Sequence, residues 1–110
     1  MNLKLFVTGT ATDIGKTYVT KHLFHFLQRQ GWRTTIFKPF QTEMLADGTY
    51  PDLESYKRDC GLSYERTSLY TFKDPVSPHL AFKREPQQHF DLQSVINRIQ
   101  TLDAQFDIVI

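Results

Sequence analysis

The sequence has few of the features that mark secreted, membrane-bound or nucleic-acid-binding proteins. It contains one cysteine, Cys60, so no disulfide can form within the chain, which suits the reducing environment of the cytoplasm. The 13 basic and 12 acidic residues give a net charge of +1, which offers no charge excess for binding nucleic acid or a membrane surface. No apolar run approaches the roughly 20 residues that cross a bilayer. Residues 1–4 lead directly into a strand-like run, without the pattern of a signal peptide. We therefore expect a cytoplasmic chain that has neither nucleic acid nor a membrane as partner.

Internal repeats and low-complexity segments are also missing, and 110 residues fit one small domain, residues 1–110. Short apolar runs alternate along the chain with segments of helical spacing. Two segments carry glycine or proline and are expected to be loops, residues 40–51 and 74–78. We expect strands over residues 3–8, 34–37, 69–72 and 106–110, and helices over residues 16–30, 51–60, 79–84 and 91–102. This order predicts an α/β fold with a mostly parallel sheet flanked by helices.

The last strand candidate ends in the run Asp107-Ile108-Val109-Ile110. Such a run is typical of a strand in the middle of a parallel sheet, where both faces are buried. Chains rarely stop inside a central strand. We therefore expect the domain to be truncated after this strand, and the chain to be the front half of a longer protein.

Residues 9–17, Gly-Thr-Ala-Thr-Asp-Ile-Gly-Lys-Thr, have the composition of a phosphate-binding loop. The loop lies between an expected strand and an expected helix, which is the context that such a motif requires. Glycines let backbone N–H groups face phosphate oxygens, and the helix N-terminus adds partial positive charge. Lys16 can reach the β- and γ-phosphates of ATP, and the Thr17 hydroxyl can ligate Mg²⁺. The spacing between the glycines is one residue longer than in the common motif, and the alternative is a tight turn with an ordinary lysine at a helix start.

The stretch from Phe6 to Thr17 resembles the opening of the dethiobiotin synthetases, which carry the same lengthened loop. The segments Lys38-Pro39-Phe40, Tyr70-Thr71-Phe72 and Pro75 to His79 match that family in the same order. The resemblance implies a P-loop NTPase-like fold and a Mg-ATP-dependent ligase of biotin biosynthesis. The substrates would be 7,8-diaminononanoate and CO₂, which react through a carbamate and a carbamic-phosphoric anhydride before the ureido ring closes. Members of the family are generally homodimers.

The resemblance also assigns roles to residues of the loop and of the second strand's end. Lys38 matches the catalytic lysine of the family. Because it follows a strand, it lies where α/β sheets bind ligands, and it could neutralise the carbamate and the developing phosphoryl charge. The alternative is a solvated lysine at a strand end. The nucleotide phosphates would be wrapped by the stretch Asp13, Ile14, Gly15, Lys16, Thr17 and Tyr18.

Two further residues match family positions in the following loop and helix. Thr42 stands where the family often has a serine that contacts substrate, and its alternative is an ordinary turn residue. Its neighbour Glu43 stands where a small residue is more usual. Asp52 matches an aspartate linked to Mg²⁺, a hard cation that takes oxygen ligands, although it could simply complement the helix dipole. Asp47 is a rival for the metal-linked role, because the length of this loop varies.

Two other functions stay open. Another P-loop ATPase, such as a partitioning or cobyrinate-amidase-like protein, would share the loop style and the strand order. Most P-loop ATPases of this kind are disfavoured by two segments of the sequence, Lys38-Pro39 and Ser77-Pro78-His79. A truncated, non-catalytic nucleotide-binding module would follow from the end of the chain at Ile110. In the family, the segment beyond the last strand supplies a second Mg²⁺-linked carboxylate, base contacts and much of the dimer interface. We therefore expect this chain alone to bind phosphate without turnover.

Overall fold

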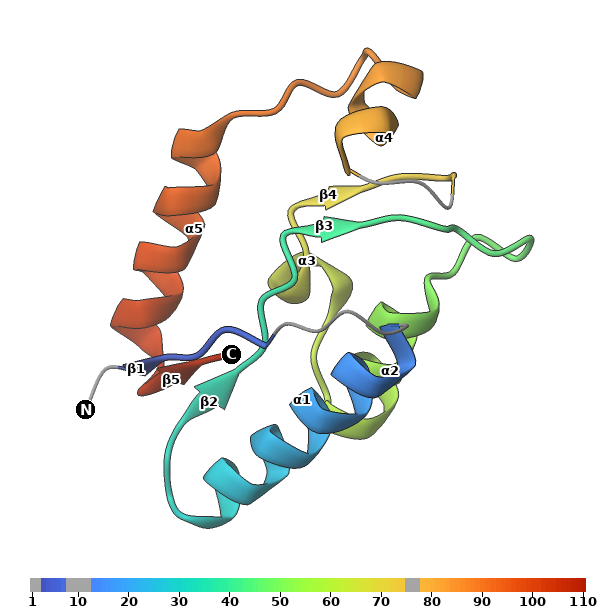
Figure 1. The fold of residues 1–110 in the computed structure, drawn as a ribbon. Coiled ribbons are helices and arrows are strands. Elements are labelled where there is room, and N and C mark those ends of the chain that lie inside the picture. Colours follow the sequence, from blue (N-terminus) through green and yellow to red (C-terminus); the bar gives the residue numbers. More distant parts are fainter. Residues whose placement is uncertain (1–2, 8–12, 75–77) are drawn as a thin grey trace.

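The computed structural model describes residues 3–7, 13–74 and 78–110, which form two small parallel sheets and the helices that pack around them (Figure 1). The elements follow one another as β1 (Leu3–Lys4), α1 (Asp13–Arg29), β2 (Thr34–Thr35), β3 (Phe40–Gln41), α2 (Pro51–Cys60), α3 (Tyr64–Thr67), β4 (Tyr70–Thr71), α4 (Pro78–Arg84), α5 (Leu92–Gln105) and β5 (Ile108–Val109).

The last strand, β5, is the central strand of the larger sheet. This sheet is parallel with the order β1-β5-β2, and Ile108 pairs with Leu3 on one side and with Thr34 on the other. Ile108 and Val109 are both buried, as expected for a strand covered on two faces. The chain crosses from β1 to β2 and then returns to β5, so right-handed crossovers place α1 and α5 on opposite faces (Figure 1). The predicted α/β class is thus confirmed.

Local signals set the ends of the helices. Helix α2 starts with Pro51 and ends at Gly61, whose φ of 70° is left-handed and whose N–H donates to the carbonyls of Lys57 and Tyr56. Helix α5 follows Asp91, whose carboxylate accepts a hydrogen bond from the N–H of Gln93 (3.0 Å). Both ends were expected from the sequence. Helix α1 was expected to start at residue 16 but starts three residues earlier, because the single apolar residue of its first turn, Ile14, is too little to reveal helical spacing.

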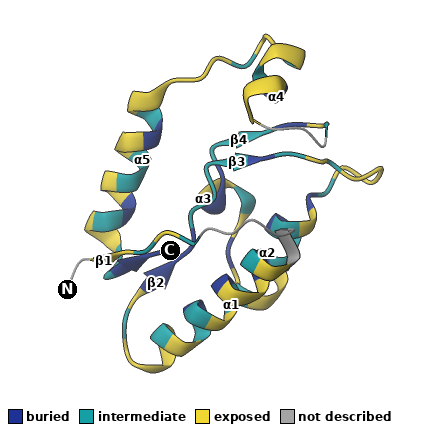
Figure 2. Cartoon of the chain, in the orientation of Figure 1, coloured by how far each residue is buried: buried dark blue, intermediate teal, exposed yellow. Residues whose placement is uncertain are grey.

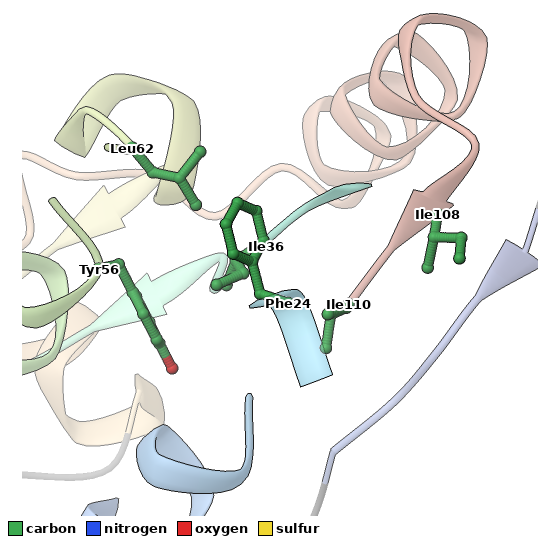
Figure 3. Packing of buried hydrophobic residues seen from close by; sticks show 6 residues of the cluster. All are labelled: Phe24, Ile36, Tyr56, Leu62, Ile108 and Ile110. Atoms are coloured by element: carbon green, nitrogen blue, oxygen red, sulfur yellow. The ribbon is translucent and has the colours of Figure 1, made fainter. Parts of the chain in front are cut away.

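Buried side chains lie between the larger sheet and the helix pair α1–α2. Figure 2 shows that burial is concentrated on β2 and β5 and on the inward faces of the helices, whereas β1 is exposed. The main cluster, drawn in Figure 3, consists of Phe24, Ile36, Tyr56, Leu62, Ile108 and Ile110. This packing holds α1 and α2 together at the edge of the sheet where the strands end. Within the described part of the chain, no helix has the length and apolar character needed to cross a membrane.

The smaller sheet corrects one expectation from the sequence. The start of the segment expected to be a loop, residues 40–51, forms β3 and pairs in parallel with β4, Phe40 opposite Tyr70. The two rings stack with centroids 5.7 Å apart, and such cross-strand aromatic pairs stabilise short strands. Helix α3 was also missed. It spans only four residues, with the hydroxyl of Ser63 accepting from the N–H of Arg66, and one turn is too short to show a helical period.

Candidate functional site

The carboxyl ends of the three strands of the larger sheet open onto one cavity of about 560 Å³. The cavity is lined by the residues that follow each strand: residues 5–7 after β1, residues 36–40 after β2 and Ile110 after β5. Ligands of open α/β sheets bind at this edge, where strand order reverses. Much of the lining is apolar, and the polar side chains Lys16, Thr17, Lys38 and Asp52 also line it. The structure therefore brings together, around one cavity, four of the residues singled out from the sequence.

Thr17 and Asp52 connect the first turns of two neighbouring helices. The Thr17 Oγ1 donates a hydrogen bond to Oδ1 of Asp52 at 2.8 Å. Thr17 is buried, and the Asp52 side chain is only 14% exposed. Asp52 is the second residue of α2, where the partial positive charge of the helix N-terminus stabilises a carboxylate. A hydroxyl and a carboxylate therefore face one another across a protected contact.

Lys38 approaches the same carboxylate from the sheet. Its Nζ lies 3.7 Å from Oδ2 of Asp52. The backbone beside it is held firmly, because the N–H of Lys38 donates to the carbonyl of Thr67 (2.7 Å) and the N–H of Phe37 donates to that of Ile110 (3.0 Å). These bonds fix the chain as it leaves β2, so the lysine is directed toward the cavity by the sheet itself.

Lys16 and Gly15 lie in the first turn of α1. Lys16 is half-buried and lines the cavity, whereas Gly15 is exposed. A Cβ placed on Gly15 would meet nothing within 4 Å, so packing inside the described chain does not require a glycine there. Close approach of a ligand such as phosphate is one physical reason for a glycine beside this helix N-terminus. The other predicted loop residues, Gly9–Thr12, lie outside the described residues, as do the side chains of Asp13 and Ile14.

Three of the sequence candidates lie apart from the cavity lining. Tyr18 is 62% exposed and packs against the ring of His22, with centroids 4.3 Å apart. Thr42 does not belong to the described lining, and its carbonyl accepts a hydrogen bond from Nε2 of Gln41 (2.8 Å). Asp47 accepts hydrogen bonds from the hydroxyl and the N–H of Thr49, which hold the pKa of its carboxyl below the usual value. Of the two rival aspartates, only Asp52 lies on the cavity with Thr17 and Lys38.

Tyr56 was not singled out from the sequence, yet it lines the same cavity and is only 4% exposed. Burial raises the pKa of its phenol, and the negative charge of Asp52 adds to this rise. The nearby hydroxyls of Thr17 and Thr20 act in the opposite direction and lower this pKa. The available signal was its position four residues after Asp52, which places both on one face of α2.

The oxygen atoms of this site suit Mg²⁺ better than a softer metal. Mg²⁺ is usually held by one or two carboxylates together with water and substrate phosphates, rather than by a cage of protein ligands. Thr17 and Asp52 offer a hydroxyl and a carboxylate of this kind. Within residues 3–7, 13–74 and 78–110, no group of three or more His, Cys, Asp and Glu side chains could hold a metal ion. The residues present thus fit a cation that is shared with a phosphate-bearing ligand.

The chain is similar to known proteins over nearly its whole length. A family model described as an AAA domain matches residues 3–110. The ATP-dependent dethiobiotin synthetase of Staphylococcus epidermidis is 59% identical over 108 residues, which cover 98% of this chain and 48% of that protein. Those of Lysinibacillus sphaericus (41% over 109 residues, 94% of this chain and 46% of that protein) and of a Geobacillus species (37% over 111 residues, 100% and 46%) are also similar.

The extent of these matches decides what they establish. The chain spans about half the length of the relatives it matches, so they support the resemblance seen in its motifs without transferring the activity of a whole enzyme. The match to the domain family covers nearly every residue. The chain therefore belongs to the AAA-domain family, and it is similar over almost its whole length to dethiobiotin synthetases.

Proposed function

We propose that this chain supplies the ATP-phosphate and Mg²⁺ part of a dethiobiotin synthetase, the enzyme of biotin biosynthesis that carboxylates and cyclises 7,8-diaminononanoate. The observation that carries the proposal is the meeting of Thr17, Asp52 and Lys38 at the strand ends, at 2.8 Å and 3.7 Å. The names of the similar proteins support the choice of reaction.

Each polar residue has a task in this proposal. Lys16 and the N-terminus of α1 bind the phosphates, because both place positive charge beside the cavity. Thr17 and Asp52 hold Mg²⁺ through their oxygen atoms, and the bound ion offsets charge on the phosphate oxygens. Lys38 stabilises negative charge that develops between substrate and phosphate. Two further assignments stay predictions. One is contact with the nucleotide by Asp13, Ile14, Gly15 and Tyr18, and the other is contact with the substrate by Thr42.

The reaction consumes one ATP for each ring. One amine of the diamine adds to CO₂ and loses a proton, which gives a carbamate. A carbamate oxygen attacks the γ-phosphate and ADP leaves, forming a carbamic-phosphoric anhydride. The second amine then attacks the carbonyl carbon, closes the ureido ring and expels phosphate. The apolar part of the cavity, which includes Phe6, Ile36 and Ile99, suits the methylene chain of this substrate. A homodimer in the cytoplasm also stays a prediction.

A chimeric enzyme tests the proposal. The 108 matched residues of the Staphylococcus epidermidis synthetase are replaced by the corresponding residues of this chain. We expect dethiobiotin formation and phosphate release that depend on diaminononanoate, CO₂ and Mg-ATP. Lys16→Ala in the chimera should abolish ATP binding, whereas Lys38→Ala should reduce turnover more than binding.

The alternatives predict different outcomes. Phosphate release that does not require diaminononanoate would point to another P-loop ATPase of the partitioning or cobyrinate-amidase-like kind. A folded chimera that binds ATP and forms no dethiobiotin would favour a non-catalytic nucleotide-binding module. A chimera in which Lys38→Ala forms dethiobiotin at the unaltered rate would contradict the role given to Lys38.

A further inference from the structure

Lys21 joins α1 to α2 one turn beyond the contact between Thr17 and Asp52. Its Nζ donates hydrogen bonds to Oγ of Ser55 at 2.7 Å and to Oδ2 of Asp59 at 2.8 Å. The Lys21 side chain is only 21% exposed, and it does not belong to the described lining of the cavity. It therefore links the two helices beside the site while lying outside the cavity itself.

The contacts between the two helices follow the same order on both. Thr17 and Lys21 are one turn apart on α1. Their partners, Asp52 first and then Ser55 and Asp59, follow one another along α2. The two helices therefore run in the same direction where they pack side by side (Figure 1). If one helix slides along the other, the distance between every facing pair of side chains changes at once.

The hydrogen bonds of Lys21 resist such sliding. The buried cluster, to which Phe24 of α1 and Tyr56 of α2 belong, holds the helices together, but apolar contacts are non-directional and oppose separation more than sliding. Ser55 and Asp59 lie four residues apart, about 6 Å along the axis of α2. Because the ammonium donates to both, a slide in either direction lengthens one of the two hydrogen bonds beyond its normal range of about 2.7–3.2 Å.

We infer that Lys21 is a positioning residue, which sets the register of α1 against α2 and thereby holds the Thr17 hydroxyl opposite the Asp52 carboxylate. The consequence for Mg²⁺ rests on the proposed function, whereas the contact between Thr17 and Asp52 belongs to the chain itself. The ammonium acts through its two acceptors on α2, so removing those acceptors should have the same effect as removing the ammonium.

The test compares Lys21→Met with Lys57→Met in the full 110-residue chain. Both substitutions remove one positive charge and keep an unbranched side chain. Lys57 is exposed on α2, with Nζ 5.9 Å from the centroid of the Tyr64 ring, and it serves as the matched control. A second variant combines Ser55→Ala with Asp59→Ala, which removes both acceptors and leaves the charge of Lys21 in place. Urea unfolding of each variant shows whether it folds cooperatively.

The first measurement needs no ligand. Urea unfolding of Thr17→Val, Asp52→Ala and the double variant gives the coupling between these two side chains, which is the departure of the double variant from the sum of the single changes in unfolding free energy. We expect this coupling in the wild-type and Lys57→Met backgrounds. Most of it should be lost in the Lys21→Met background and in the background that lacks both acceptors.

The second measurement is ATP binding by calorimetry, with Mg²⁺ and with EDTA. Loss of a group that orients metal ligands typically lowers metal affinity by about 10–100-fold. We expect Mg-ATP affinity to fall about tenfold in Lys21→Met and in the variant without the two acceptors, with little change in EDTA and none in Lys57→Met. Direct attraction between Lys21 and the phosphates would instead weaken binding in EDTA as well, and would tighten it when the acceptors are removed.

The outcomes separate this inference from the function on which it partly rests. If the wild type binds no ATP, or if Thr17→Val binds Mg-ATP as tightly as the wild type, the proposed function fails and the coupling alone decides the role of Lys21. Unchanged coupling in the Lys21→Met background, or no coupling in the wild type, overturns the inference whether or not ATP binds. Where Thr17→Val does lower Mg-ATP affinity, unaltered affinity in Lys21→Met overturns it, as does tighter binding in the variant without the two acceptors.

Discussion

Asp52 can be replaced in two ways that separate its charge from its hydrogen bond. Asparagine keeps an oxygen that accepts the proton of Thr17, but it loses the negative charge beside Lys38 and at the start of α2. A partly exposed ion pair contributes about 0–1 kcal/mol, and a charge at a helix N-terminus about 0.3–1 kcal/mol. We therefore expect Asp52→Asn to lower the free energy of unfolding by about 1 kcal/mol.

Alanine removes the acceptor as well. The Thr17 hydroxyl is buried and would lose the group to which it donates, which costs about 1–3 kcal/mol. Asp52→Ala should therefore be less stable than Asp52→Asn by about 2 kcal/mol, a shift of roughly 1–2 M in the urea midpoint. The single tryptophan, Trp32, packs against the core cluster and gives a fluorescence signal for unfolding.

The two variants should behave alike toward the cation. Both lack the carboxylate, so both should lose Mg²⁺-dependent ATP affinity by about tenfold or more. Asp47→Ala is the matched control, because this rival aspartate is hydrogen-bonded only within its own loop by Thr49 in the described structure. Equal stability of Asp52→Asn and Asp52→Ala would refute the role of the hydrogen bond. Loss of Mg²⁺ dependence in Asp47→Ala, with Asp52→Asn unaffected, would reverse the choice between the aspartates.

Three other predictions concern the surroundings of the site. Glu43 has a left-handed φ of 67°, so Glu43→Gly should raise the free energy of unfolding by about 0.5–1 kcal/mol, and Glu43→Ala, measured in the same urea titration, should give no gain. Hydrogen bonds from Arg58 and then from Lys21 lower the pKa of Asp59 from 3.8 to about 2. Its contribution to stability is therefore complete above pH 4 and is lost as the pH falls toward 2, and Asp59→Asn should make the unfolding midpoint less dependent on pH over that interval. Burial raises the pKa of the Cys60 thiol to about 11, so a disulfide reagent at pH 8 should modify the folded chain much more slowly than the chain in urea; equal rates would contradict this assignment.

The parts of the fold that sequence reasoning found are those set by neighbouring residues. Pro51 and Gly61 mark the two ends of α2, and Asp91 caps α5, each through its own backbone or side-chain geometry. The apolar run at Ile108 indicated a central strand, because both faces of such a strand are covered. The pairing of β3 with β4 depends instead on contact between Phe40 and Tyr70, which lie far apart in the chain, and two-residue strands carry no period of their own.

The same distinction explains which of the predicted residues lie on the cavity. Lys16 and Thr17 belong to a contiguous motif, and Lys38 follows a strand, so each could be placed from local sequence. Thr42 was placed by analogy, but the N–H groups of Glu43 and Met44 donate to the carbonyls of Asp74 and Lys73, which holds this segment against the chain after β4. No local pattern reports that pairing.

Tyr56 shows what a motif cannot report. As one residue of α2 it looks like any aromatic side chain on the buried face of a helix, and its ring does pack in the core. It lines the cavity as well, because α1 and α2 lie together. A phenylalanine would satisfy the hydrophobic pattern equally well. The place of Tyr56 on the cavity therefore depends on the packing of α2 against α1, which no local pattern reports.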